Sequence, residues 1–183
     1  MPDPKVVLDR DTMRRTLTRI AHEIVENGGE PSRLALVGIH RRGAVLAARL
    51  RVLLAELHDV DVPLGDLDIA FYRDDVTLRG GTPIVHATHL DFDVDGLTVV
   101  IVDDVLFTGR TVRAAIEALF DYGRPARVRL AVLCDRGHRE LPFRADFVGK
   151  NLPTARHERV NVRVAEMDGA DEVTITELQE AAV

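Results

Sequence analysis

The chain has 183 residues, of which 46% are hydrophobic and 30% charged, a composition that fits one globular domain and excludes wholesale disorder. The longest apolar run, 97–102, is far shorter than the roughly 20 residues of a membrane span, so we expect no membrane association. The N-terminus lacks a signal-peptide layout, and the single cysteine, Cys134, excludes a disulfide framework. We therefore expect a cytoplasmic protein. The net charge of −6 argues against bulk binding to nucleic acid, but residues 136–163 hold seven basic and three acidic side chains, so a local basic face is possible.

Hydrophobic spacing predicts alternating helices and strands. The expected helices are 9–27, 43–57 and 111–122, and the expected strands are 33–39, 68–72, 97–102, 127–133, 159–165 and 172–175. Residues 73–96 have no sustained period and are typical of a lid loop, whereas 136–157 are predicted to be irregular and basic. Strands without polar alternation, separated by helices, indicate an α/β fold with a mostly parallel sheet. In such sheets, ligands bind beyond the carboxyl ends of the strands.

The most informative segment is 99–111, in which a hydrophobic strand leads to two adjacent carboxylates, Asp103 and Asp104. Each carboxylate can accept a hydrogen bond from one hydroxyl of a vicinal diol. The turn that follows offers backbone N–H groups, two hydroxyls and a helix N-terminus, which together favour an anion. Its residues are Thr108, Gly109, Arg110 and Thr111. A diol site beside a phosphate site predicts a ribose 5-phosphate; the alternative is that the carboxylates cap the next helix and the turn is plain.

A glycine-bounded loop follows the predicted strand 33–39. It consists of Gly38, Ile39, His40, Arg41, Arg42 and Gly43. The terminal glycines permit a tight turn, and the two arginines can meet a polyanion. Taken alone, this pattern is also typical of a solvated basic loop.

Segment 99–111 resembles the ribose-phosphate signature of type I phosphoribosyltransferases, which transfer ribose 5-phosphate from phosphoribosyl diphosphate (PRPP) to a nitrogen base. The resemblance implies that Asp103 and Asp104 hold the ribose hydroxyls, that 108–111 cradle the 5-phosphate, and that 38–43 is the pyrophosphate loop, with Arg42 at the family's usual arginine. It implies one domain over 1–183, with a flexible lid at about 73–96 and a small hood from about 136–157 and both chain ends. Mg²⁺ would be carried by PRPP rather than by a protein cage.

The residue before the Thr-Gly pair bears on the choice of base. In family members that use 6-oxopurines it is typically an acid that contacts the purine, and here it is Phe107. An aromatic ring cannot replace that acid, so a pyrimidine is favoured. We expect uracil near the end of the strand 127–133, at Asp135, Arg136, Gly137 and His138.

Segments 17–23 and 135–154 extend the resemblance to the bifunctional pyrimidine operon regulators with uracil phosphoribosyltransferase activity, over about residues 5–176. This implies that the protein makes UMP and diphosphate from uracil and PRPP, and that it binds the mRNA leader of a pyrimidine operon (attenuation) under the control of UMP or UTP. The positions of the family's RNA-binding surface are Thr18, Arg19, His22, Arg139, Arg144 and Lys150. A homodimer or higher homo-oligomer would join two such surfaces.

Two alternatives remain open at this point. In the first, the protein is a pyrimidine or purine phosphoribosyltransferase without an RNA role. In the second, it is a regulator whose site only senses UMP or PRPP. Intact Asp103 and Asp104 favour turnover, and the basic positions favour a regulator.

Overall fold

A computed structural model describes residues 4–74 and 87–178, in which the main layer is a five-stranded sheet. The strands are β2 (Leu34–Ile39), β3 (Leu64–Leu67), β4 (Thr98–Leu106), β5 (Arg127–Asp135) and β6 (Phe147–Asn151). They lie in the order β3-β2-β4-β5-β6, and all neighbours are parallel. Strand β2 is buried along its whole length, as expected for a sheet covered on both faces. The predicted α/β class is confirmed.

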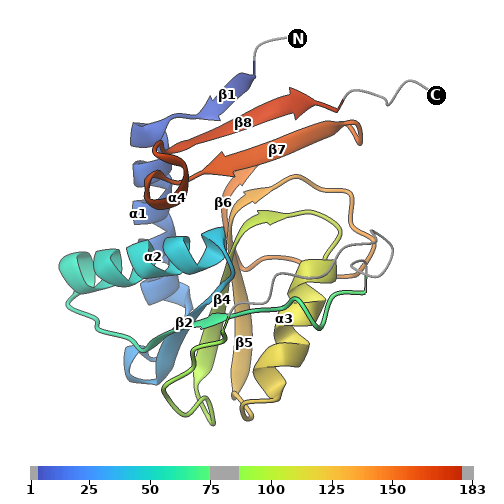
Figure 1. Ribbon diagram of the computed structural model, residues 1–183. Helices are drawn as coiled ribbons and strands as arrows, with labels where there is room; N and C mark the ends of the chain where they lie inside the picture. Colours follow the sequence, from blue (N-terminus) through green and yellow to red (C-terminus); the bar gives the residue numbers. More distant parts are fainter. Residues whose placement is uncertain (1–3, 75–86, 179–183) are drawn as a thin grey trace.

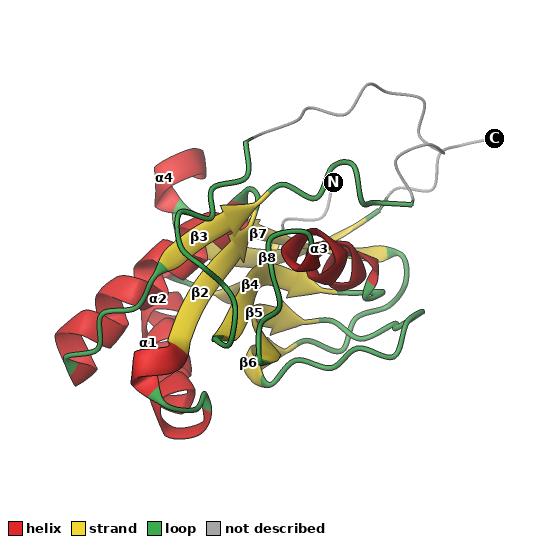
Figure 2. Cartoon of the chain, turned by 90° about the horizontal axis from the view of Figure 1, so that it is seen from below, coloured by secondary structure: helices red, strands yellow, loops and turns green. Residues whose placement is uncertain are grey.

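Helices cover both faces of this sheet (Figure 2). Helices α1 (Arg10–Asn27) and α2 (Arg42–His58) pack on one face and α3 (Arg110–Phe120) on the other. Alternate residues of β4 serve the two layers, since Val100 packs with α1 and α2 and Ile101 packs with α3. The N-cap of α1 is Asp9, whose Oδ1 accepts a hydrogen bond from the Thr12 amide at 2.8 Å.

A smaller antiparallel sheet lies at the top of Figure 1, above α1 and α2. It consists of β1 (Lys5–Leu8), β8 (Glu172–Glu177) and β7 (Glu158–Arg163), in that order. The short helix α4 (Ala165–Asp168) connects β7 to β8, and a 3₁₀ turn (Pro31–Arg33) precedes β2. This sheet therefore joins the two ends of the described chain. No helix in the described ranges is long and apolar enough to cross a membrane.

Two of the predicted segments differ in the structure. The strand expected at 68–72 lies at 64–67 instead, because the Asp68 carboxylate accepts a hydrogen bond from the Ala70 amide at 2.8 Å and closes a turn. The segment 136–157, expected to be irregular, contains β6, an edge strand whose half-exposed residues lack a clear hydrophobic pattern. Of the lid expected over 73–96, residues 75–86 lie outside the described residues.

Candidate functional site

Two adjoining cavities lie at the carboxyl ends of β2 and β4. One, of about 230 Å³, is lined by residues 39–42 together with Asp103 and Asp104. The other, of about 200 Å³, is lined by Asp103 and residues 105–112. The structure therefore brings the two loops singled out in the sequence to one place, with Asp103 shared between them.

Asp103 and Asp104 lie within the C-terminal half of strand β4 rather than at a helix cap. Asp103 Oδ1 accepts from the Asp104 amide at 2.9 Å, and Asp104 Oδ1 accepts from the Val105 amide at 2.8 Å. Asp103 is only 7% exposed, and burial together with the charge of Asp104 raises its pKa well above the ordinary value. The N-cap of α3 is Gly109, so the alternative in which the carboxylates cap that helix is wrong. The pair instead faces the cavities, where hydroxyl donors or a cation would relieve its desolvation.

The turn at 108–111 presents mainly backbone and hydroxyl groups to the second cavity. Gly109 has φ = 94°, which favours glycine, and a Cβ there would lie in tight contact with Cδ2 of Phe143, at 3.1 Å. The Arg110 amide donates to Thr108 Oγ1 at 3.3 Å, and the Arg110 guanidinium pairs with Glu140 (2.9 Å) and Asp74 (2.6 Å). The N-terminus of α3 therefore offers a site for a phosphate without using the Arg110 charge.

The loop at 38–43 packs tightly against β4. A Cβ on Gly43 would lie 2.4 Å from the Val102 carbonyl oxygen, so a larger residue would push α2 off the sheet. The peptide bond between His40 and Arg41 is cis. His40 Nε2 donates to Asp66 Oδ1 of β3 at 2.5 Å. The loop is therefore held in two places: Gly43 packs against β4, and His40 is hydrogen-bonded to β3.

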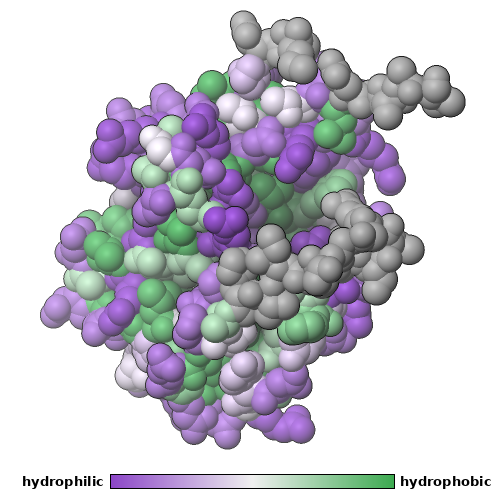
Figure 3. All heavy atoms as spheres, in the orientation of Figure 1, coloured by the Kyte–Doolittle hydropathy of each residue, from purple (hydrophilic) through white to green (hydrophobic). Residues whose placement is uncertain are grey.

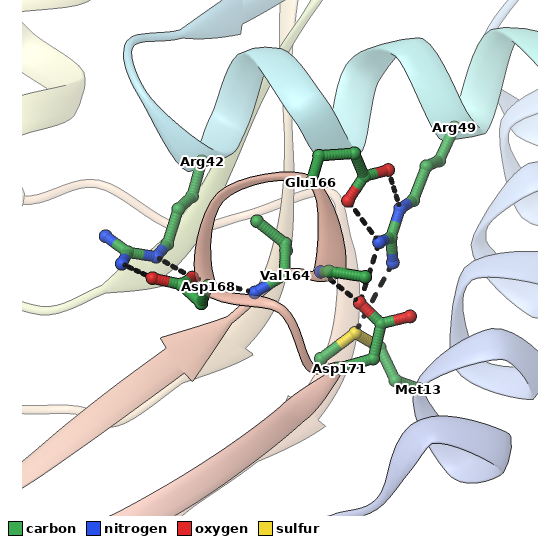
Figure 4. Close-up of polar contacts among 8 residues, drawn as sticks. Met13, Arg42, Arg49, Val164, Glu166, Asp168 and Asp171 are labelled. Carbon is green, nitrogen blue, oxygen red and sulfur yellow. Dashed lines mark hydrogen bonds and ion pairs between the residues drawn. The ribbon is translucent and has the colours of Figure 1, made fainter.

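Ion pairs tie α2 to the turn between β7 and β8 (Figure 4). Arg42 Nη2 donates to Asp168 Oδ1 at 2.8 Å. Seven residues along α2, Arg49 pairs with Glu166 (2.5 Å) and Asp171 (2.7 Å). The Val164 amide and the Arg42 guanidinium lower the pKa of Asp168. We expected Arg42 to meet a diphosphate. It lines the cavity, and its guanidinium is paired with Asp168 at the end of α4.

The region expected to bind the base contains an aromatic–cation cluster. The Arg136 guanidinium lies 4.1 Å from the centroid of the Phe107 ring, and the His138 ring meets the same ring edge-on at 6.0 Å. Arg136 is 7% exposed and donates to the carbonyls of Ala155 and Glu158. Burial lowers the pKa of Arg136. Phe107 is 38% exposed and lines the second cavity, so its planar ring remains accessible to a molecule bound there.

Of the remaining predicted residues near this cluster, Gly137 and Asp135 shape the backbone: the Gly137 amide donates to Asp135 Oδ1 at 3.0 Å. The sequence analysis missed Arg73, which lines both cavities and whose charge lowers the pKa of Asp103 against the burial. Its signal was its position, a basic residue in the segment that follows β3.

The residues expected to bind RNA fall into two groups. Arg19 donates to the carbonyls of Val148 and Gly149 in β6, and Lys150 of the same strand donates to the Val7 carbonyl at 3.2 Å. Thr18 and His22 of α1 complete the first group. Arg144 is exposed too, but it lines a small cavity with residues of α3 and β5. Arg139 differs, because its guanidinium donates to the carbonyls of Phe107 and Phe143, each at 2.8 Å, and to Asp135. It belongs to the loops behind the second cavity.

Comparison with known proteins agrees with this geometry. The phosphoribosyl transferase domain family matches residues 6–166. The bifunctional protein PyrR of Roseiflexus sp. (strain RS-1) is 61% identical over 165 residues, 90% of each chain. The protein of the same name from Chloroflexus aurantiacus is 58% identical over 175 residues, 96% of each chain. In structure, the hypoxanthine phosphoribosyltransferase of Trypanosoma cruzi superposes with a TM-score of 0.71 at 20% identity, covering 96% of this chain and 97% of that one, which shows a common fold. The chain belongs to the phosphoribosyl transferase domain family and, within it, to the bifunctional PyrR proteins.

Proposed function

We propose that this chain carries out both activities implied by its sequence resemblance. It transfers ribose 5-phosphate from PRPP to uracil, giving UMP and diphosphate, and it regulates a pyrimidine operon by binding the mRNA leader. The observation that carries the enzymatic half is the pair of cavities joined at Asp103, since a carboxylate pair between two anion sites matches a ribose with phosphate groups at both ends.

The proposed chemistry depends on binding and orientation. The ribose hydroxyls donate to Asp103 and Asp104, the 5-phosphate lies on the turn 108–111, and the diphosphate lies against 38–43 with Arg42 beside it. Nitrogen N1 of uracil bonds to the anomeric carbon, the bond from that carbon to the diphosphate oxygen breaks, and the N1 proton passes to solvent. Fixing the reacting atoms supplies much of the rate, and the cationic loop stabilises the leaving charge.

Mg²⁺ is proposed to arrive with PRPP. The carboxylates of Asp103 and Asp104 give the shared cavity the oxygen donors that this ion prefers, so the site fits it. When bound with the substrate, Mg²⁺ neutralises charge on the departing diphosphate.

The base is proposed to be uracil, stacked near Phe107 with its polar edge toward 135–138. The ring of Phe107 offers a planar apolar contact and no acceptor for a purine N7. Steady-state assays with uracil, orotate, adenine and hypoxanthine, each with PRPP and Mg²⁺, test this. We expect turnover with uracil and none with the two purines; efficient turnover of hypoxanthine would contradict the assignment.

The RNA surface is proposed to include α1 and the edge strand β6, where Arg19 and Lys150 lie together. Phosphate contacts from these basic residues and contacts to unpaired loop bases would hold a folded leader. Arg139 links this function to the active site, because its guanidinium binds the Phe107 carbonyl beside the 5-phosphate turn. UMP in the site is therefore expected to strengthen RNA binding.

Filter binding with the protein's own pyrimidine-operon leader, with and without UMP or UTP and across a salt series, tests the RNA role. Arg144→Gln and Arg19→Gln are expected to weaken binding and flatten the salt dependence while uracil turnover stays near normal. Arg33→Gln, which removes an exposed charge outside the proposed surface, is the matched control. If the wild-type protein binds no leader, the chain is a salvage phosphoribosyltransferase.

The assembly and setting are proposed as follows. The chain forms one domain, with a hood from about 136–157 and the two chain ends, which include β1, β7 and β8, and with a lid at about 73–96, of which residues 75–86 lie outside the described residues. Hydrophobic side chains lie exposed on α2, including Val52 and Leu57, and Figure 3 shows hydrophobic surface at the left where that helix lies. A homodimer or higher homo-oligomer in the cytoplasm would cover this surface, and light scattering of the purified protein measures the assembly.

A further inference from the structure

Three side chains with metal-ligating atoms converge beside the pyrophosphate loop. His40 belongs to that loop, Asp66 to β3, and His89 to the segment that pairs with β3. The ligand atoms all lie within 4.8 Å of one another. His40 Nε2 lies 2.5 Å and His89 Nδ1 3.1 Å from the same carboxylate oxygen, Asp66 Oδ1. Two imidazole nitrogens are thus aimed at a single point.

The backbone holds this arrangement in place. The amide of Asp66 donates to the His89 carbonyl at 2.9 Å, and the amide of His89 donates to the Asp66 carbonyl at 3.0 Å. The His40 amide is held in turn by the Leu67 carbonyl at 3.0 Å. All three ligands are therefore fixed to the edge of the main sheet, and an ion that replaces the shared protons requires side-chain adjustment only.

We propose that His40, Asp66 and His89 bind a divalent cation of the Zn²⁺, Co²⁺ and Ni²⁺ class. Two imidazoles and one carboxylate are the donor set of zinc sites, whereas Mg²⁺ prefers oxygen ligands alone. The three protein ligands leave a fourth tetrahedral position open, as in catalytic zinc sites. This cation is distinct from the Mg²⁺ carried by PRPP, because its ligands are the two imidazoles and Asp66 rather than Asp103 and Asp104.

The position of the site gives the cation a role. His40 lines the cavity assigned to the diphosphate, and the other two ligands belong to β3 and its neighbouring segment. A bound ion therefore fastens the pyrophosphate loop to the sheet edge. Because the ion binds only the folded arrangement, it also stabilises the fold, by an amount that grows with the logarithm of its concentration once the site is occupied.

The test uses the whole protein with Co²⁺ and Zn²⁺ and without PRPP, uracil or RNA, so its result does not depend on the proposed function. Titration with Co²⁺ is followed by visible absorption, and Zn²⁺ binding by equilibrium dialysis. We expect one strong site per chain and a rise in Tm with Zn²⁺. His89→Gln is expected to lower the affinity at least about tenfold, since loss of an outer-sphere partner alone costs about 10- to 100-fold.

Two control variants make the outcome decisive. His157→Gln removes an exposed histidine outside the cluster and is expected to leave the site unchanged. His58→Gln removes a histidine whose ring lies 4.7 Å from that of His22, the other close pair of imidazoles in the described chain. Wild-type affinity in both His89→Gln and Asp66→Asn would overturn the proposal. Loss of the site in His58→Gln alone would also overturn it and assign the metal to the His22–His58 pair.

Discussion

The two loops proposed to bind the phosphate groups of PRPP are built in opposite ways. The turn 108–111 faces its cavity with backbone amides and hydroxyls from consecutive residues at the start of α3. The loop 38–43 faces its cavity with side chains held by acids from elsewhere, His40 by Asp66 and Arg42 by Asp168. The first loop is therefore a local structure, and the second is a product of the tertiary fold.

This difference teaches where each loop is vulnerable. A backbone site fails when its dihedral angles change, and neighbouring side chains matter little. A site of paired side chains loses affinity in small steps, because each remote acid can be removed without changing the backbone. The predictions below break or sharpen this contrast.

The largest effect is expected from Gly109→Ala. An alanine here must adopt φ near 94° with its Cβ 3.1 Å from Phe143 Cδ2, so the amides of the turn 108–111 are displaced. A misplacement of about 1 Å costs about a hundredfold in rate, and we expect a loss of that order in kcat/KM for PRPP. Gly96→Ala is the matched control, since Gly96 has φ = 71° and open space around it. Equal activity losses in the two variants would show that backbone strain, not the turn, is responsible.

Asp104→Asn tests the carboxylate between the two loops. The amide oxygen can still accept from the Val105 amide, so the fold should persist while one ribose hydroxyl loses its charged acceptor. We expect turnover to fall at least tenfold, about 1.4 kcal/mol. Steady-state kinetics measure the loss, and circular dichroism checks the fold. Wild-type kinetics would remove the ribose from this position.

Asp168→Asn is expected to have a smaller effect, because it removes the charge that holds Arg42 while the amide oxygen can still accept from the Val164 amide. Partly exposed ion pairs contribute about 0.2–1 kcal/mol, so KM for PRPP should rise between about 1.5- and 5-fold with kcat nearly unchanged. Glu166→Gln is the control: it weakens the neighbouring Arg49 pair and leaves the Arg42 contact intact. If both variants change KM equally, Asp168 acts on the whole small sheet rather than on Arg42.

The smallest effect concerns pH and stability. The Arg49 guanidinium lowers the pKa of Glu166, and the Val164 amide and Arg42 lower that of Asp168. Carboxyls with depressed folded-state pKa values stabilise the fold above their unfolded values and lose that contribution as pH falls through the folded ones. The free energy of unfolding should therefore decrease as the solution becomes more acidic than about pH 4. Urea unfolding across this range should show a shallower decrease in Glu166→Gln; an unchanged slope would mean that other carboxyls dominate.

The parts that sequence predicted are those specified by neighbouring residues. The strand and turn over 99–111 carry their hydrophobic run, carboxylates and glycine in one segment, and the structure places that segment beside the loop 38–43. Helix α1 was predictable for the same reason, because Asp9 caps it and its buried residues recur at helical spacing. Local chemistry sufficed in these places.

The parts that sequence missed depend on distant partners. Strand β6 contains Gly149, Lys150 and Asn151, and only its pairing with β5 makes it a strand. Strand β3 was displaced by four residues because the turn at Asp68 ends it. Its Gly65 is required by the His89 backbone, whose carbonyl oxygen would lie 2.8 Å from a Cβ there. No residue near Arg42 indicates that Asp168 is its partner. Such pairings become visible only when the chain is folded.

The small sheet also determines when the fold can be completed during translation. Strand β1 leaves the ribosome first, but its hydrogen-bonding neighbour is β8, which is translated after every strand of the main sheet. Residues 166–171, which neutralise Arg42 and Arg49, are likewise translated late. Since synthesis proceeds from the N-terminus, a nascent chain lacks the ion-pair partners of Arg42 and Arg49 until residues 166–171 have been translated. The loop 38–43 thus acquires the acid that holds Arg42 only after the whole main sheet has been translated.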